Sequence, residues 1–333
     1  MKPKVLLLSF PLFLSGCIPF TDGTLGEEGY VWCNNRYLAP NGAPFTMDVT
    51  GTVAVQGYMY GLAAALVLQQ DNSEGDAHHF TKPSRLVQLD AAPRKASGFE
   101  ASTFRLKPVT PDVKEEIIIA FAGSNDWADW FTNINPLPNR TQYNQAVAYV
   151  LEMTARPDVA GKRLVVTGIS LGGALAVHVT KNPATSALIS ETWAINSSPR
   201  TYADSERDKR IWSVASDKEA LTWSRKPGFH PYAGWGLIKG DPDHSAQDFN
   251  LIDSNLFYAH YRWGIARQML FVADYKLSKR GSVNEWTEPL AILHNSKFKS
   301  CEPPYKLPPK EAIQPSSPTP PDYSGYEPLI APQ

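Results

Sequence analysis

The chain has almost no net charge, few cysteines and no motif for binding a metal or a phosphate. Its 333 residues carry a formal net charge of −1, and lysine and arginine form no cluster, which argues against a nucleic-acid binder. The 7 histidines lack the His-x-x-x-His spacing and the 3 cysteines form no Cys-x-x-Cys pair, so we expect no metal site. No glycine-rich phosphate loop occurs, and we expect no cofactor. The hydrophobic fraction of 43% is typical of one large globular domain.

The first 16 residues have the pattern of an export signal. A basic start precedes an apolar stretch at residues 5–14 that is too short to span a bilayer. It ends in Leu14-Ser15-Gly16-Cys17, which resembles a bacterial lipobox and implies that Cys17 becomes a lipidated N-terminus. We therefore expect an exported lipoprotein at a membrane surface, and Ile18 after the cysteine favours the outer membrane. A cleaved signal with an incidental cysteine is the alternative.

Two cysteines remain when Cys17 is set aside, namely Cys33 and Cys301. They can pair in an oxidising periplasm, which would join the start of the mature chain to the end of its domain. Closing so long a loop would stabilise the fold by about 4 kcal/mol or more in the loop-entropy model. Two free buried thiols are the alternative.

Four segments are predicted along the chain. Residues 1–16 are the signal, 17–48 an N-terminal segment, 49–301 the folded domain, and 302–333 a proline-rich tail without an apolar face to bury.

Within the domain, apolar runs typical of strands alternate with helical patterns. Alternation of this kind predicts an α/β fold with a mostly parallel central sheet flanked by helices. Residues 49–70 carry no charged side chain and predict a helix buried against the sheet, with a membrane segment as the alternative. We expect strands at residues 99–106, 115–121, 164–167, 192–196 and 210–214, and helices at residues 143–156 and 256–274.

One segment carries a catalytic motif. The apolar run at residues 164–167 meets Gly168-Ile169-Ser170-Leu171-Gly172 and passes directly into a helix of small residues. This is the setting of a nucleophile elbow, a sharp turn that exposes a serine at the edge of an α/β-hydrolase sheet. Glycines are needed beside the serine because Cβ atoms there would collide with the neighbouring strand and helix. We predict that Ser170 is a nucleophile; an ordinary glycine-rich turn is the alternative.

A second motif makes the pattern resemble a known family. Phe121-Ala122-Gly123-Ser124 follows a buried strand, Asp129-Trp130-Phe131-Thr132-Asn133 comes next, and together with the elbow they resemble the class 3 lipase family. The resemblance implies that Ser124 and the N–H of Leu171 form the oxyanion hole; a turn-capping Ser124 is the alternative. Two positions depart from the family, because Ile169 replaces its histidine and Ala122 its arginine.

A serine nucleophile also needs a carboxylate that orients its base, and in this fold the acid follows the serine in sequence. We predict Asp217, which follows the expected strand at residues 210–214. Asp204 and Asp241 are the other candidates, and Asp217 as an ordinary surface charge is the alternative.

The general base is predicted to be His260, with His244 as the alternative. His260 lies at the head of the last amphipathic stretch, where bacterial relatives of this family tend to carry the histidine, and His244 lies in a loop-like segment.

These residues predict a serine carboxylic-ester hydrolase that acts on acyl lipids or related esters through an acyl-enzyme. An inactive lipoprotein that serves as a binding module, and an acyltransferase or thioesterase with the same triad, are the alternatives.

Overall fold

Seven strands form one sheet whose spatial order follows the chain order. The computed structural model describes residues 30–31, 48–67, 69, 79–110, 113–123, 140–217, 219–225, 238, 240–249, 252–253, 258–277 and 287–296. The first three strands pair antiparallel, and all later neighbours pair in parallel. In order across the sheet they are β2 (Leu86–Ala92), β3 (Ala101–Leu106), β4 (Glu116–Phe121), β5 (Arg163–Ile169), β6 (Glu191–Ile195), β7 (Ile211–Ser216) and β8 (Ser245–Phe249). This confirms the predicted α/β fold with a mostly parallel sheet.

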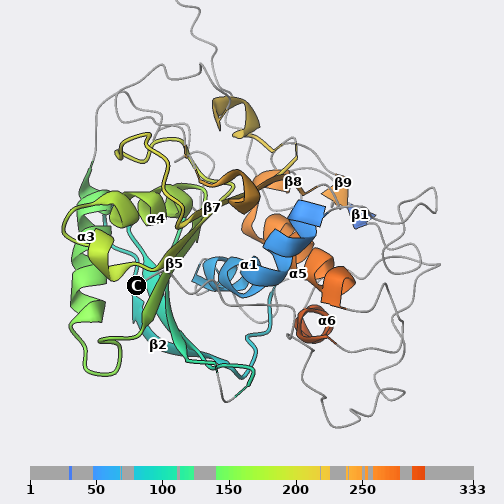
Figure 1. Cartoon of the computed structure of the whole chain (residues 1–333), viewed down its shortest axis with the longest axis horizontal. Helices are drawn as coiled ribbons and strands as arrows, with labels where there is room; N and C mark the ends of the chain where they lie inside the picture. The colour runs from blue at the N-terminus through green and yellow to red at the C-terminus, as the bar shows by residue number, and fades with distance from the viewer. Residues whose placement is uncertain are drawn as a thin grey trace, which may run out of the picture.

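Helices cover both faces of the sheet, and the strand order explains which helix lies where (Figure 1). Helices α3 (Thr141–Thr154) and α4 (Leu171–Lys181) follow β4 and β5 and share one core cluster, as expected of right-handed crossovers between successive parallel strands, which place their helices on the same face. The other face is covered by α1 (Asp48–Val67) and α5 (Arg262–Leu277), with α6 (Glu288–Asn295) beside α5.

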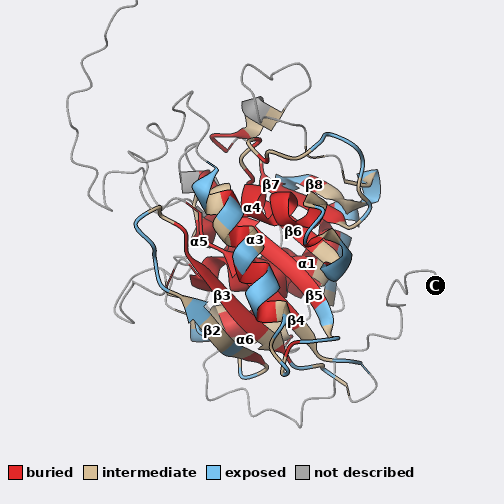
Figure 2. Ribbon diagram, turned by 90° about the vertical axis from the view of Figure 1, so that its left-hand side faces the viewer, coloured by how far each residue is buried: buried red, intermediate tan, exposed pale blue. Residues whose placement is uncertain are grey.

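Successive side chains of β4 pack alternately into the helix layers on the two faces of the sheet. Ile117 and Ile119 pack under α3 and α4, whereas Ile118 and Ala120 point to the α1 and α5 side. All four are fully buried, and Figure 2 shows the inner strands buried between the helices. A strand buried on both faces reads as a continuous apolar run, which is why this one could be predicted.

Helix α1 is a core helix, as predicted for the uncharged stretch at residues 49–70. Leu62 and Ala63 are fully buried, and its glycines allow close approach. A Cβ on Gly57 would lie 2.2 Å from the Trp193 ring, and one on Gly61 would lie 2.7 Å from the Met269 sulfur. No helix within the described ranges is both long and apolar enough to cross a membrane.

The strands β2 and β8 and the helix α6 were not predicted. Both strands lie at the edges of the sheet, and polar side chains such as Gln88 and Asp90 interrupt the apolar pattern of β2. A short ladder of β1 (Tyr30–Val31) with β9 (Ile252–Asp253) was also missed. The signal at residues 1–16, the tail at residues 302–333 and the three cysteines lie outside the described residues.

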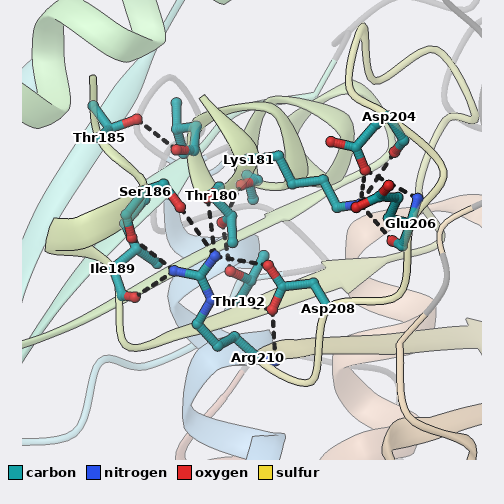
Figure 3. A network of polar contacts seen from close by, with 12 residues as sticks. Thr180, Lys181, Thr185, Ser186, Ile189, Thr192, Asp204, Glu206, Asp208 and Arg210 are labelled. Atoms are coloured by element: carbon teal, nitrogen blue, oxygen red, sulfur yellow. Dashed lines mark hydrogen bonds and ion pairs between the residues drawn. The ribbon is translucent and has the colours of Figure 1, made fainter. Parts of the chain in front are cut away.

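Arg210 connects the start of β7 to the end of α4 (Figure 3). Its guanidinium donates to the carbonyls of Ser186, Ile189 and Thr180 at 2.7, 3.1 and 3.2 Å. Asp208 accepts from it at 2.7 and 3.0 Å, which balances the charge. The network lies at a loop between helix and strand, and we interpret it as structural.

Candidate active site

Ser170 stands at the turn between β5 and α4, as the motif predicts. Its backbone has φ 59° and ψ −121°, a strained conformation that persists only where the surroundings enforce it. The Ser170 N–H donates to Ile195 O at 2.9 Å, so β6 holds the turn in place. A Cβ on Gly172 would lie 2.1 Å from Phe121 O, which explains the glycine of the motif. The serine side chain is thereby fixed beside the carboxyl ends of the parallel strands.

His260 lies next to this serine. It ends the 3-10 turn η4 (Tyr258–His260), two residues before α5 begins, and its Nε2 is 2.9 Å from Ser170 Oγ. Its Nδ1 is 2.5 Å from Oε2 of Glu219. Because an ionised carboxylate only accepts hydrogen bonds, Nδ1 carries the proton and Nε2 of a neutral ring accepts from the serine hydroxyl. This is the arrangement in which a histidine can act as general base toward a serine.

The carboxylate at the histidine is Glu219, not Asp217, and the sequence-based expectation is corrected here. Asp217 still follows the line of β7, because its N–H donates to Phe249 O at 2.8 Å. Strand β7 ends at Ser216, and the side chain of Glu219, three residues further on, reaches His260. The other two candidates are engaged elsewhere: Asp204 pairs with Lys181, and Asp241 caps a 3-10 turn.

The Glu219 side chain is completely buried, with none of its surface exposed. Burial alone would raise the pKa of this carboxyl, but His260, Arg225 and the Leu221 N–H together hold the pKa below its ordinary value. The Leu221 N–H donates to Oε2 at 2.8 Å. Glu219 therefore stays ionised beside the imidazole.

Asn196 ties the acid and base segments to the sheet. Its Oδ1 accepts from Ser216 N–H at 2.9 Å, and its Nδ2 lies 3.2 and 3.3 Å from the carbonyls of Ala259 and His260. The residue is fully buried and has φ 40°, in the left-handed region that asparagine tolerates better than most residues. One amide thus positions the turn that carries His260 against the end of β7.

His244, the alternative base, lies away from the serine–histidine pair. Its Nδ1 is 2.8 Å from Lys209 O, and its ring stacks on Trp212 with centroids 3.9 Å apart. Leu171 begins α4, so its N–H lies in the first turn of that helix. Ser124 and the stretch at residues 129–133 lie outside the described residues.

Sequence reasoning missed Glu219 and Asn196. Glu219 follows β7 by three residues, and Asp217 was predicted instead because it comes directly after the strand. No local signal marks Asn196, because its three partners come from distant parts of the chain.

Comparison with known proteins points to lipases. Residues 62–189 match a phospholipase-like family model described as the Tle-like phospholipase domain. An extracellular phospholipase A1 from Serratia liquefaciens is 38% identical over 101 residues, which cover 30% of this chain and 26% of that protein. The chain thus aligns with about a quarter of this relative. These findings confirm the resemblance to the class 3 lipase family.

Solved lipase structures are also similar. A Rhizomucor miehei lipase in complex with its propeptide is 14% identical, with a TM-score of 0.38 and coverage of 69% of this chain and 80% of that one. A triacylglycerol lipase from Penicillium expansum is 13% identical, with a TM-score of 0.38 and coverage of 63% and 84%. Because these scores are low, the fold assignment depends on the sheet order and the elbow of this chain itself.

Proposed function

We propose that this lipase-like chain is a serine carboxylic-ester hydrolase of acyl lipids, with Ser170, His260 and Glu219 as its catalytic triad. One observation supports this most strongly: two hydrogen bonds connect the Ser170 hydroxyl to the His260 imidazole and the imidazole to the buried Glu219 carboxylate. A serine hydroxyl is a weak nucleophile at neutral pH and needs such a base, which in turn needs an orienting carboxylate. The order serine, acid, histidine along the chain agrees with an α/β-hydrolase.

In the proposed mechanism, Ser170 Oγ attacks the acyl carbon while His260 Nε2 takes the hydroxyl proton. Glu219 stabilises the imidazolium that forms. Nε2 then returns the proton to the leaving alkoxide, which departs as an alcohol and leaves an ester on Ser170. Water, deprotonated by the same imidazole, hydrolyses this ester and releases the carboxylic acid. The N–H of Leu171 and Ser124 are the proposed donors to the oxyanion.

A phospholipid is the favoured substrate, because the matched family model and the Serratia relative are both described as phospholipases. That relative is described as extracellular, which agrees with the export signal expected at residues 1–16. We propose that a lipid on Cys17 holds the enzyme at the membrane surface where acyl lipids are concentrated.

The test combines labelling with product analysis. Wild-type protein should react with a fluorophosphonate probe at Ser170 and release fatty acid from phosphatidylcholine vesicles, whereas Ser170→Ala should do neither. Ser186→Ala, which removes a hydroxyl that belongs to the Arg210 network and not to the proposed triad, is the matched control and should keep both activities. A wild-type protein that neither reacts with the probe nor cleaves esters would be an inactive binding module. Acyl transfer to an added alcohol or thiol in preference to water would identify a transferase.

A further inference from the structure

Both oxygens of the Glu219 carboxylate are engaged. Oε2 faces His260 and the Leu221 N–H, whereas Oε1 lies in ion-pair contact with Nη2 of Arg225, the last residue of the 3-10 turn η2 (Thr222–Arg225). Neither Oε1 nor Nη2 makes a hydrogen bond within the described part of the chain, so the contact is electrostatic. The two side chains are 0% and 7% exposed, and water screens the pair very little.

Arg225 also reaches the segment that supports the nucleophile. Its Nη1 donates to Ser197 O at 3.3 Å, and the N–H of the next residue, Ser198, donates to Ser170 O at 3.0 Å. The guanidinium is therefore fixed between the acid and the turn that bears the serine.

We propose that Arg225 is a positioning residue of the triad, which orients the Glu219 carboxylate and offsets part of its charge. The inference rests on the proposed function, because it assigns Arg225 a role in the same site. Arg225 acts through Glu219, because its contacts within the described residues are with the Glu219 carboxylate and Ser197 O. Its effect on catalysis is to set how strongly the carboxylate stabilises a protonated His260.

The sign of this effect follows from the charges that meet at the carboxylate. Arg225 approaches from η2 and His260 from η4, so a protonated His260 and the guanidinium compete for one negative charge. Without Arg225, the whole charge of Glu219 acts on the imidazole and favours its protonated form. The rate of Ser170 labelling falls at low pH as the imidazole becomes protonated, and this acidic limb of the pH–rate profile should then move to higher pH by about one unit. A merely structural arginine would alter the folded fraction and leave the limb in place.

The experiment measures the rate of fluorophosphonate labelling of Ser170 between pH 4.5 and 8, normalised to the amount of folded protein. Arg225→Gln removes the charge, and Arg225→Lys keeps it. Arg210→Gln is the matched control, because Arg210 is also a charge-paired arginine that holds backbone carbonyls, but it lies in the network of Figure 3.

We expect the limb of Arg225→Gln to lie about one pH unit above that of wild type, with Arg225→Lys and Arg210→Gln unchanged in position. A wild-type limb in Arg225→Gln, or an equal shift in all three variants, would overturn the proposal. If Arg225→Gln does not fold, the same pH profile of Arg225→Lys tests the proposal. A limb that stays in place with a lower plateau rate supports the proposal, and a limb that moves refutes it. Failure of the proposed function is distinguishable, since wild-type protein would then not be labelled at all.

Discussion

Replacement of Glu219 by glutamine should abolish most of the hydrolase activity, whereas replacement of Asp217 by asparagine should not. Glu219 Oε2 lies 2.5 Å from His260 Nδ1, and an amide nitrogen at that place would donate to Nδ1 and favour the wrong tautomer of the ring. In a serine triad such a change reduces turnover about 10³–10⁴-fold, or about 4–5.5 kcal/mol of transition-state stabilisation.

The same substitution also affects folding, and the assay must separate the two effects. Glu219→Gln leaves the buried Arg225 without its anion, and breaking a buried ion pair costs about 3–5 kcal/mol of unfolding free energy. We would therefore measure kcat and KM on a p-nitrophenyl ester at a temperature where urea titration shows each variant to be folded. Glu219→Asp keeps the charge but withdraws it by one methylene, and a displacement of this size costs about 10²-fold.

Asp217→Asn is the control, since the backbone N–H of this neighbouring residue donates to Phe249 O and the carboxylate at His260 belongs to Glu219. Its kcat should lie within about twofold of wild type. The assignment of the acid would be refuted by the opposite pattern, in which Asp217→Asn loses about 10³-fold and Glu219→Gln remains active.

Three further predictions concern the nucleophile elbow, the side-chain amide of Asn196 and the pH dependence of stability. Gly172→Ala places a Cβ 2.1 Å from Phe121 O, so the free energy of unfolding should fall by about 3 kcal/mol or more; an unchanged urea midpoint would contradict this. Asn196→Ala leaves buried backbone groups without partners, so the free energy of unfolding should fall by about 3 kcal/mol and Ser170 labelling should slow at least tenfold. Labelling at the wild-type rate would show that Asn196 does not position His260. Burial lowers the pKa of His178 despite its contact with a backbone carbonyl, so the unfolded chain takes up a proton first as pH falls below about 6.5, and stability is lost there. His178→Gln should lose less of its urea midpoint between pH 7 and pH 5 than wild type does, and an equal loss would show that His178 does not contribute.

The sequence predicts those parts of the fold that depend on short stretches of chain. Ser170 could be located because the strand, the glycines and the helix that expose it are contiguous. The inner strands could be located because burial on both faces requires continuous apolar runs. The edge strands β2 and β8 have one face in contact with water, so their patterns resemble those of polar loops.

The acid could not be chosen from the sequence because its position depends on where β7 stops. Asp217 and Glu219 are two residues apart, and the pairing of Asp217 N–H with Phe249 O keeps Asp217 beside the end of β8, whereas Glu219 reaches His260. That pairing involves β8, which gives no clear pattern of its own. His260 could be proposed because a helix pattern follows it, but only the fold brings it 2.9 Å from Ser170 Oγ.

The packing of α1 against α5 has a consequence for how the chain acquires its structure. Helix α1 is complete at Val67, yet its partner α5 begins only at Arg262, about 200 residues later. At about 5–20 residues per second, a growing chain exposes this largely apolar helix for about 10–40 s before its partner has been synthesised. Contacts so distant in sequence form slowly, and the exposed helix is prone to aggregation in the meantime. A shortened chain that ends before α5 would keep the whole nucleophile elbow but leave the α5-facing side of α1 uncovered, and we expect it to be recovered only as aggregate.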